Sequence, residues 1–512
     1  MVIRQKNSLK RKIKKTISMR KENNKGAVTV YICLVIAFLV PVILMIIGLS
    51  RYSAMQVEVE CACNLATDSL TAEYNRDLLE DYGLLFIDTS YLGECGSLDK
   101  TLSHLNRYLD KNLKPDESLS PVGGRNLFGY EVINTEITRA SRATDGDGEV
   151  LRYMADEYML DRFGISLIDE VKKMVSASSN LKLDEIDINE NNDKAQKEIQ
   201  DFKPSEENEG ENWNETKKED PAKGISELRA KGILGIVVPG IISGTSIEAG
   251  NYVSQRNLVV GDGLTEDKKK NKLNGIEEKL LFNEYIMIFT GNYRSKKDKS
   301  LLSYQTEYII CGNDTDEQNL KEIVNKLILL RGACNTVYYL TDVEKHEETL
   351  AMAEALSAAT GCPLLTPLYQ AAIDLAWIYA ESVLDVKKIM RGECVPLVTT
   401  YEDWDLSLEK VINNAEEAFN DEYKTSGNNG GDEKEIGTPL KMKYSDYLRL
   451  FLYMENEKEK NMRLMDVIEM DINYKNANGN FKLDNCISDL TVQIGIESDS
   501  GYEYFYEKEC GF

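Results

Sequence analysis

The strongest hydrophobic pattern of the chain lies near its start. Residues 26–49 form a run of 24 residues without a charged side chain, directly after a basic segment. As a helix this run would be about 36 Å long at roughly 1.5 Å per residue, which exceeds a hydrocarbon core of about 30 Å. Pro41 lies within it, and transmembrane helices tolerate proline. The pattern predicts a transmembrane helix with the candidate anchor residues Gly26, Ala27, Pro41 and Gly48.

A helical pattern continues beyond this run. Apolar and small residues recur at spacings of three and four, as in Met55, Val59 and Ala62, and they would form one face of a helix. Gly83 is a suitable residue for the end of that helix. We expect residues 50–82 to form a stalk helix that continues the transmembrane helix.

The remaining pattern divides the chain into two mixed regions. Residues 83–183 and 224–512 alternate helix-like segments with shorter strand-like ones, and residues 184–223 between them are rich in charge and poor in apolar residues. That composition favours a disordered acidic linker. The strand-like segments include YEVINTEITRA, SYQTEYIICG and NTVYYL, and the end of the chain predicts a hairpin that turns at Ser498–Gly501. We predict a helix-dominated α+β class, with a mixed α/β head outside the membrane.

A second apolar run, GILGIVVPGIISGT, covers residues 232–245. It is too short for a transmembrane helix and is interrupted by glycine and proline. We therefore expect a buried loop or a short core strand there.

Charge adds an orientation to the predicted anchor. The formal net charge is -25, yet residues 1–25 contain ten Lys or Arg and one acid, which leaves 51 basic and 85 acidic residues in the rest. Under the positive-inside rule, residues 1–25 are cytoplasmic and residues 51–512 lie outside the cell membrane. The segment GLSRYSAM after the run matches a signal-peptidase site poorly, which favours a permanent single-pass anchor. So acidic a body disfavours nucleic acid as a partner.

The inventory of reactive residues argues against most enzyme classes. There are two histidines, and CxxC, GxGxxG, GxxxxGK[ST] and GxSxG motifs do not occur. We therefore expect neither a metal nor a cofactor, and we do not expect an enzyme. The ten cysteines are scattered, so buried thiols and a disulfide framework both stay open, with buried thiols favoured.

One charged cluster remains a candidate site. Glu381, Asp385 and Lys388 follow Trp377 at helical spacing and share one face of an apolar helix. Paired carboxylates can perform acid–base chemistry, which would make the protein an ectoenzyme. Buried charges more often pair with other charges, and the sequence favours a structural ion-pair network. The candidate members of that network are Arg331, Glu381, Asp385, Lys388, Arg463 and Asp466.

The segment from KGAVTVYICLV to DLLEDYGLLFID resembles the start of a Firmicutes family of unknown function, DUF5702, which is related there to TadE/TadG-like pseudopilins. Downstream segments that resemble the same family are EYIICG, LILLRGACNTVYYL, AWIYAESVLDVKKIMRGECVPL, YSDYLRLFLYM and RLMDVIEMDI. The resemblance implies a membrane-anchored component of a tight-adherence (Flp) pilus or a related surface apparatus. Its partners would be membrane lipid, pilus or envelope proteins, and other copies of the chain through the transmembrane and stalk helix.

The same resemblance raises the question of cleavage. Prepilin sites have glycine before the cut, as Gly26 would be, and commonly glutamate at the fifth mature position, where this chain has Tyr31. The missing acid favours an uncleaved anchor. Two other classes stay open: an anchored extracellular ligand-binding module and the ectoenzyme.

Overall fold

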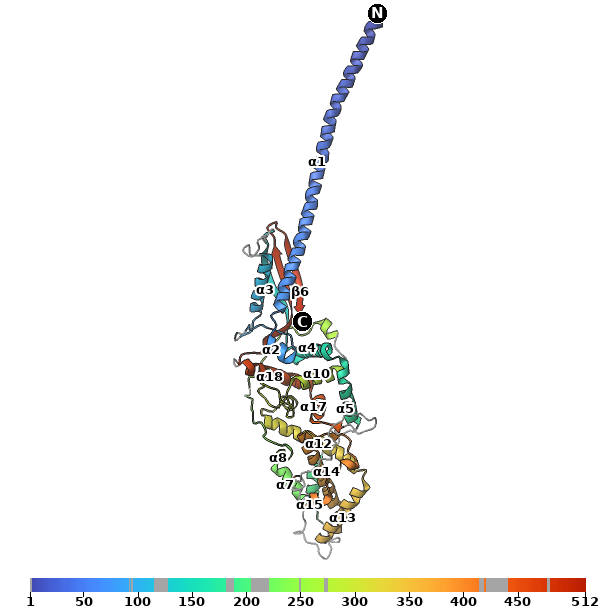
Figure 1. The fold of residues 1–512 in the computed structure, drawn as a ribbon, viewed down its shortest axis with the longest axis vertical. Coiled ribbons are helices and arrows are strands. Elements are labelled where there is room, and N and C mark those ends of the chain that lie inside the picture. The colour runs from blue at the N-terminus through green and yellow to red at the C-terminus, as the bar shows by residue number, and fades with distance from the viewer. Residues whose placement is uncertain are drawn as a thin grey trace. The chain divides into compact units, whose positions relative to one another are not determined.

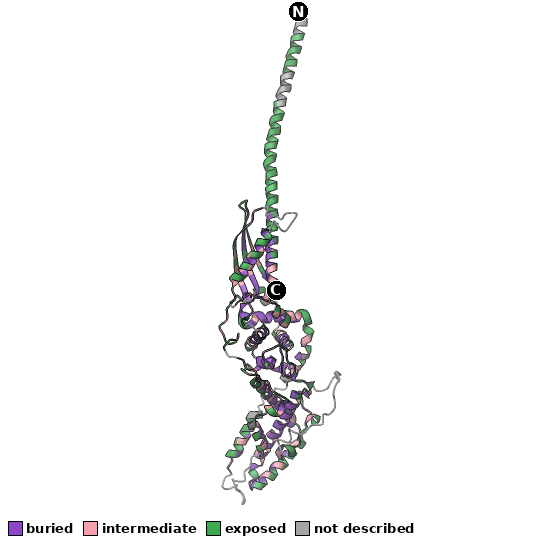
Figure 2. Cartoon of the chain, turned by 60° about the vertical axis from the view of Figure 1, so that its left-hand side comes forward, coloured by how far each residue is buried: buried purple, intermediate pink, exposed green. Residues whose placement is uncertain are grey.

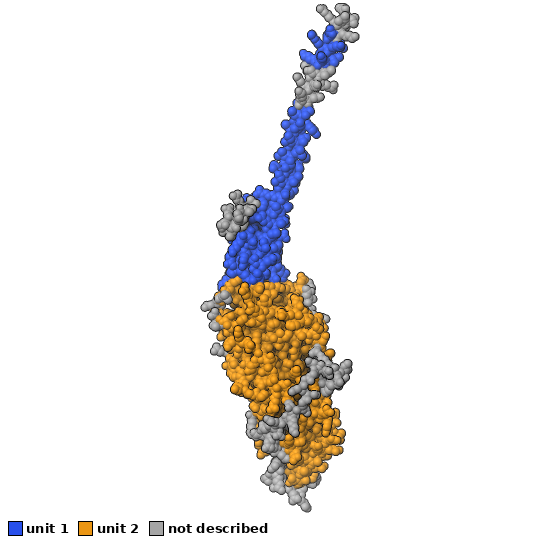
Figure 3. Space-filling view, in the orientation of Figure 1, with its two compact units in different colours: residues 1–73, 98–139, 490–511 blue, residues 74–97, 140–489, 512 orange. Residues whose placement is uncertain are grey.

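The computed structural model describes most of the chain, and helices dominate it (Figure 1). This confirms the predicted helix-dominated α+β class. Described are residues 2–91, 93, 95–114, 128–180, 188–203, 221–247, 250–270, 275–413, 419, 441–476 and 479–512. The chain forms two compact units, coloured separately in Figure 3. Unit 1 consists of residues 1–73, 98–139 and 490–511, and unit 2 consists of residues 74–97, 140–489 and 512.

Unit 1 is built on one long helix, α1 (Val2–Thr71), which continues through Pro41. Its other elements are α3 (Leu98–Leu113), β2 (Glu131–Arg142), β5 (Cys486–Glu497) and β6 (Glu503–Gly511), the strands contributing the parts that lie in unit 1. β5 pairs with β2 and with β6, and α1 packs on α3 and β6. The predicted terminal hairpin is present, closed by a bond from Gly501 N–H to the Ser498 carbonyl (2.8 Å).

Burial along α1 changes abruptly (Figure 2). Residues 26–54 are all exposed, whereas from Met55 onward one face of the helix is buried. The buried positions follow helical spacing because that face packs on α3 and β6: Met55, Val59, Ala62, Ala66 and Leu70.

The predicted stalk helix is interrupted. α1 ends at Thr71, and a second helix, α2 (Arg76–Tyr82), begins in unit 2. Asn75 explains the new start, because its side chain accepts a hydrogen bond from the Leu78 N–H (3.1 Å) and caps α2. Gly83 ends α2 with a left-handed backbone (φ +69°), as its position in the sequence suggested.

Unit 2 is a helical assembly in which α14 (Thr366–Arg391) packs on α12 (Asp316–Tyr339), α13 (Val343–Thr360) and α6 (Ile188–Asp201). α10 (Gly275–Phe289) and α18 (Glu457–Asn476) both pack on α4 (Asp145–Phe163). The remaining helices are η1 (Ile165–Ile168), α5 (Asp169–Asn180), α7 (Lys223–Lys231), α8 (Leu234–Val237), α9 (Glu266–Lys270), α11 (Gln305–Cys311), η4 (Pro363–Leu365), η5 (Tyr401–Asp403), α15 (Leu408–Asn413), α17 (Tyr444–Met454) and η6 (Leu483–Asn485). The short strand β1 (Ile87–Asp88) pairs antiparallel with the start of β5, and β3 (Val395–Pro396) pairs antiparallel with β4 (Lys441–Met442).

Two predicted strands are wrong. SYQTEYIICG contains the helix α11, and NTVYYL is the end of α12 and its C-cap. α12 begins at the N-cap Thr315, whose side chain accepts the Gln318 N–H (3.2 Å), and then runs for 24 residues. The aromatic and β-branched residues that suggested strands are instead buried by helix packing, which overrides weak local propensity.

The acidic linker prediction is wrong for residues 188–201, which form α6. Ala195 and Ile199 are buried at helical spacing, and α6 packs on α14. The central part of the predicted linker, residues 204–220, lies outside the described residues. The run at residues 232–245 contains α8 and the buried Val237 and Val238. In the described ranges, one helix is long and apolar enough to cross a membrane, and it is α1.

Candidate functional site

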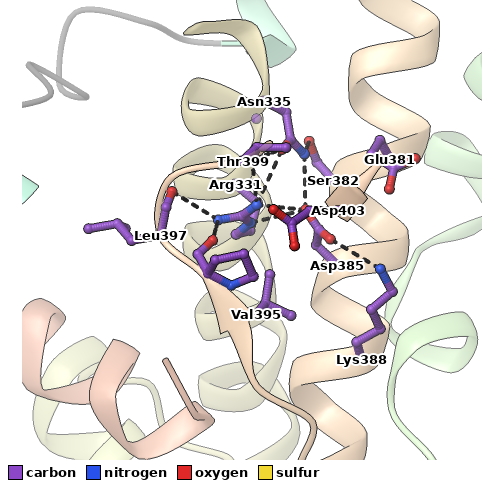
Figure 4. A network of polar contacts seen from close by, with 12 residues as sticks. Arg331, Asn335, Glu381, Ser382, Asp385, Lys388, Val395, Leu397, Thr399 and Asp403 are labelled. Atoms are coloured by element: carbon purple, nitrogen blue, oxygen red, sulfur yellow. Dashed lines mark hydrogen bonds and ion pairs between the residues drawn. The ribbon is translucent and has the colours of Figure 1, made fainter. Parts of the chain in front are cut away.

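The charged cluster in unit 2 centres on the fully buried Arg331 of α12 (Figure 4). Its guanidinium faces Asp385 of α14, with Nη2 and Nε donating to Oδ2 at 2.9 and 3.1 Å. Asp385 is 3% exposed, so both charges lie away from water. Geometry of this quality is needed to offset the desolvation of an internal ion pair.

The other N–H groups of Arg331 are also bonded. Nη1 donates to the carbonyls of Pro396 (2.7 Å) and Leu397 (3.3 Å), and Nη2 donates to the Thr399 hydroxyl (2.9 Å). Asn335 joins the network because its side-chain amide donates to Asp385 Oδ2 (3.1 Å). The network therefore ties the end of β3 and the segment after it to α12 and α14.

Lys388 and Glu381 occupy the edge of this cluster. Lys388 lies 3.6 Å from Asp385 Oδ1 and also pairs with Asp405. Glu381 accepts the backbone N–H groups of Asp405 (3.1 Å) and Leu406 (2.9 Å). Burial and, to a lesser extent, the nearby Asp385 charge raise the pKa of the Glu381 carboxyl to about 8.

This arrangement favours a structural role over acid–base catalysis. Glu381 is fully buried, and both of its carboxylate oxygens already accept backbone hydrogen bonds. A general acid or base must reach the proton that it transfers. In the described ranges no group of His, Cys, Asp and Glu residues is placed to hold a metal ion.

Two residues of the predicted network have other partners. Arg463 of α18 donates Nη1 hydrogen bonds to the carbonyls of Ile309 (3.1 Å) and Ile310 (2.9 Å) near the end of α11. Asp466 accepts the Tyr308 hydroxyl and the Ser254 N–H, both at 2.9 Å. The structure thus brings together Arg331, Asp385 and Lys388, places Glu381 beside them, and uses Arg463 and Asp466 to hold α11.

Glu307 of α11 is a buried acid that the sequence reading missed. Its Oε1 accepts the Tyr293 N–H and the Tyr444 hydroxyl, both at 2.7 Å. Its Oε2 is buried and has no hydrogen-bond partner among the residues that the structure describes. Burial raises the pKa of this carboxyl to about 7. The signal in the sequence was an acidic residue inside the apolar segment YQTEYIICG. The segment was predicted to be a strand, and that prediction did not place Tyr293 or Tyr444 next to Glu307.

Replacing Glu381 with alanine should release the segment after η5. The N–H groups of Asp405 and Leu406 would lose their acceptors, and an unsatisfied buried donor costs about 1–3 kcal/mol. Hydrogen exchange of the full chain should show faster exchange at Leu406, whereas the exposed E409A control should not change it. Unchanged protection of Leu406 in E381A would contradict the assigned contact.

The predicted anchor residues all lie in the exposed part of α1: Gly26, Ala27, Pro41 and Gly48. A Cβ added at Gly26 or at Gly48 would meet no atom within 4 Å. The other half of α1 is held by polar contacts as well as by packing. Asn64 Oδ1 accepts the Tyr506 hydroxyl (2.9 Å) and Lys508 Nζ (2.8 Å) from β6. Within unit 1, β6 therefore holds the part of α1 that follows the uncovered apolar residues.

A second polar contact closes the end of α1. The Glu73 carboxylate lies 2.8 Å from His104 Nδ1 and accepts the Tyr108 hydroxyl at 2.5 Å. Both partners belong to α3, so the chain just after α1 is tied to the helix that packs beside it. Five of the described cysteines are buried free thiols: Cys63, Cys334, Cys362, Cys486 and Cys510.

Comparison with known proteins gives one match. Residues 211–498 fit the model of a family of unknown function, DUF5702, and this range is more than half of the chain. It contains Arg331, Glu381 and Asp385, but it does not contain α1. No curated protein and no solved structure matches the chain. The resemblance of the amino-terminal segment to TadE/TadG-like pseudopilins stays a prediction.

Proposed function

The chain belongs to the DUF5702 family, and from this premise we propose that it is a membrane-anchored surface protein that acts through protein–protein association. Its role would be that of a structural or assembly component of a Tad/Flp-type pilus or a related envelope apparatus. The amino terminus would be cytoplasmic, and the residues after the anchor would lie outside the cell. The apolar half of α1 is the observation that carries this proposal.

The apolar side chains of residues 26–49 are exposed in the structure and require a bilayer or another protein to shield them from water. Residues 26–49 contain no charge, and large side chains such as Leu34 and Phe38 are 65% and 73% exposed. An apolar surface of this extent is rare on a soluble monomer, whereas a bilayer covers it at no cost to the helix, whose backbone bonds are internal. The ten basic residues before it favour a cytoplasmic amino terminus.

The construction of unit 1 supports an architectural role. α1 runs without a break from the uncovered segment into a face packed on α3 and β6. A tethered enzyme needs only a flexible link to its anchor, but here the anchor helix is part of a folded unit. Such a helix fixes the orientation of unit 1 with respect to the bilayer, which suits a protein that docks to neighbours in an assembly. The burial of Glu381 and Asp385 supports the same preference over an ectoenzyme.

Crosslinking from the stalk in living cells tests the association. A photo-crosslinking residue at the exposed Glu60 of α1 should capture specific envelope or pilus proteins, because this position is free of the contacts on the buried face. Mass spectrometry would identify the captured proteins, and the same probe at the exposed Glu409 of unit 2 is a matched comparison. Capture of nothing but the chain itself or lipid would contradict the proposal.

Topology is measured in parallel on the same strain. Protease added to cells stripped of their wall should digest the residues beyond α1, and the chain should stay in carbonate-washed membranes. Survival of these residues in intact cells, with digestion in lysed controls, would contradict the orientation. Mass-spectrometric reading of the mature amino terminus tests the uncleaved anchor, and a chain that begins at Ala27 would overturn it.

A further inference from the structure

We infer that residues 9–15 of α1 form a binding surface for the anionic phospholipids of the membrane that holds the chain. The inference rests on the proposed anchor, since the anchor delivers this segment to a bilayer. Residues 9–15 would thus make a second contact with the membrane, one that depends on the charge of the lipid headgroups. The apolar span depends only on the thickness and apolarity of the bilayer.

The segment concentrates positive charge. Five of its seven residues are basic and none is acidic: Lys10, Arg11, Lys12, Lys14 and Lys15. All five are exposed on α1. In the described ranges no ion pair with an acidic side chain holds any of them within the helix. Clusters of this kind next to a membrane span bind acidic headgroups, which supply the complementary charge.

The two other residues of the segment are apolar and exposed. Leu9 and Ile13 are 60% and 52% exposed and lie four residues apart, so they share one face of the helix. The sequence repeats the apolar position at Ile17. A basic helix with an apolar stripe is suited to lie in the headgroup region, with the stripe towards the acyl chains.

Distance decides how the segment reaches the surface. Lys15 precedes Gly26 by a length of about 16 Å at roughly 1.5 Å per residue. The field of an anionic surface fades within about 8–10 Å at physiological salt. A helix standing straight up from the bilayer would therefore leave the charges outside that field. In this structure α1 is unbroken from Val2 to Thr71. Asn23, Asn24 and Gly26 have low helix propensity, and our inference includes a bend at these residues when the segment lies on a bilayer.

The same charges could attract nucleic acid, but the placement favours lipid. The segment is continuous with the apolar part of α1, so the proposed anchor tethers it within reach of a headgroup layer. Its apolar stripe, Leu9 and Ile13, can be buried among acyl chains in a bilayer, whereas a phosphate backbone offers no apolar surface to bury it. The remainder of the chain carries strong negative charge, which opposes nucleic acid.

Hydrogen exchange of the full chain in nanodiscs tests the inference. The discs contain phosphatidylcholine alone or a mixture with phosphatidylglycerol. The amides of residues 9–15 should exchange at least about tenfold more slowly in the anionic discs, and added salt should reverse this protection. The double variant L9S/I13S should lose it. V57S/L65S is the matched control, because Val57 and Leu65 are equally exposed on α1 (59% and 56%) but lie beyond the span.

Each outcome bears on one claim. Protection of residues 26–49 in both discs, without protection of residues 9–15 in either, would overturn this inference and keep the anchor. Equal protection of residues 9–15 in both discs would overturn recognition of lipid charge, as would an equal loss in V57S/L65S. Protection by added RNA in the neutral discs, with none in the anionic discs, would assign the segment to nucleic acid instead. Unprotected residues 26–49 would overturn the anchor and the inference with it.

Discussion

Replacing Arg331 with methionine is expected to destabilise unit 2 by about 3–5 kcal/mol, because it leaves Asp385 charged and buried without its partner. The loss extends beyond the ion pair, since the carbonyls of Pro396 and Leu397 and the Thr399 hydroxyl also lose a donor. Denaturant unfolding of the full chain, followed by tryptophan fluorescence, measures it. Trp377 and Trp404 report on this part of unit 2, with ring centroids 5.6 Å apart.

A second variant separates the unpaired charge from the lost volume. R331M/D385L removes both charges, and it should be more stable than R331M, because an apolar pair of similar size carries no desolvation cost. The control is K321M, which makes the same kind of change at an exposed position of the same helix and should cost less than about 0.5 kcal/mol. If R331M were as stable as K321M, the pair would contribute nothing to the fold.

The second large effect is a pH dependence that originates at Glu307. The pKa of its carboxyl is about 7 in the folded chain and 4.5 when unperturbed, so the folded state holds a proton that the unfolded state has released between these values. Stability from this group is complete below about pH 4.5 and declines until the pH has passed about 7. The total decline is on the order of 3 kcal/mol.

E307Q should remove this decline. The glutamine oxygen can still accept the Tyr293 N–H and the Tyr444 hydroxyl, and the side chain stays neutral at every pH. The free energy of unfolding of E307Q minus that of the parent chain should therefore rise by about 2.5 kcal/mol between pH 5 and pH 8. The same comparison for E317Q, at an exposed position of α12, should stay flat. A flat E307Q difference would show that Glu307 is already ionised at pH 5.

The sequence was sufficient for features that depend on the local pattern. The apolar run and the spacing of Met55, Val59 and Ala62 predicted a helix that is first uncovered and then buried on one face, and α1 has this form. Arg331 and Asp385 stood out because charges in apolar helices need partners. What the sequence could not supply was the packing of helices distant along the chain. It therefore grouped Arg463 with Arg331, whereas Arg463 binds the carbonyls of α11.

Other errors have an equally specific origin. Glu381 is held by the backbone N–H groups of Asp405 and Leu406. Almost every residue has such a donor, so the sequence does not show which residues provide it. α6 looked like a linker because its many charges hide two apolar residues, Ala195 and Ile199, four positions apart. The division into units was equally hidden, since unit 1 joins segments from both ends of the chain.

That joining has a consequence for biosynthesis. The face of α1 that carries Met55 and Leu70 is completed by β6, which is synthesised long after α1 and α3. At about 5–20 residues per second, the nascent chain waits on the order of tens of seconds between making α3 and making β6. In the proposed topology, the apolar part of α1 is inserted throughout this interval, while the face that later packs on β6 is open to chaperones and proteases. In the proposed topology, the export and folding machinery would therefore meet an anchored but unfinished protein, and the synthesis of β6 would decide when unit 1 is complete.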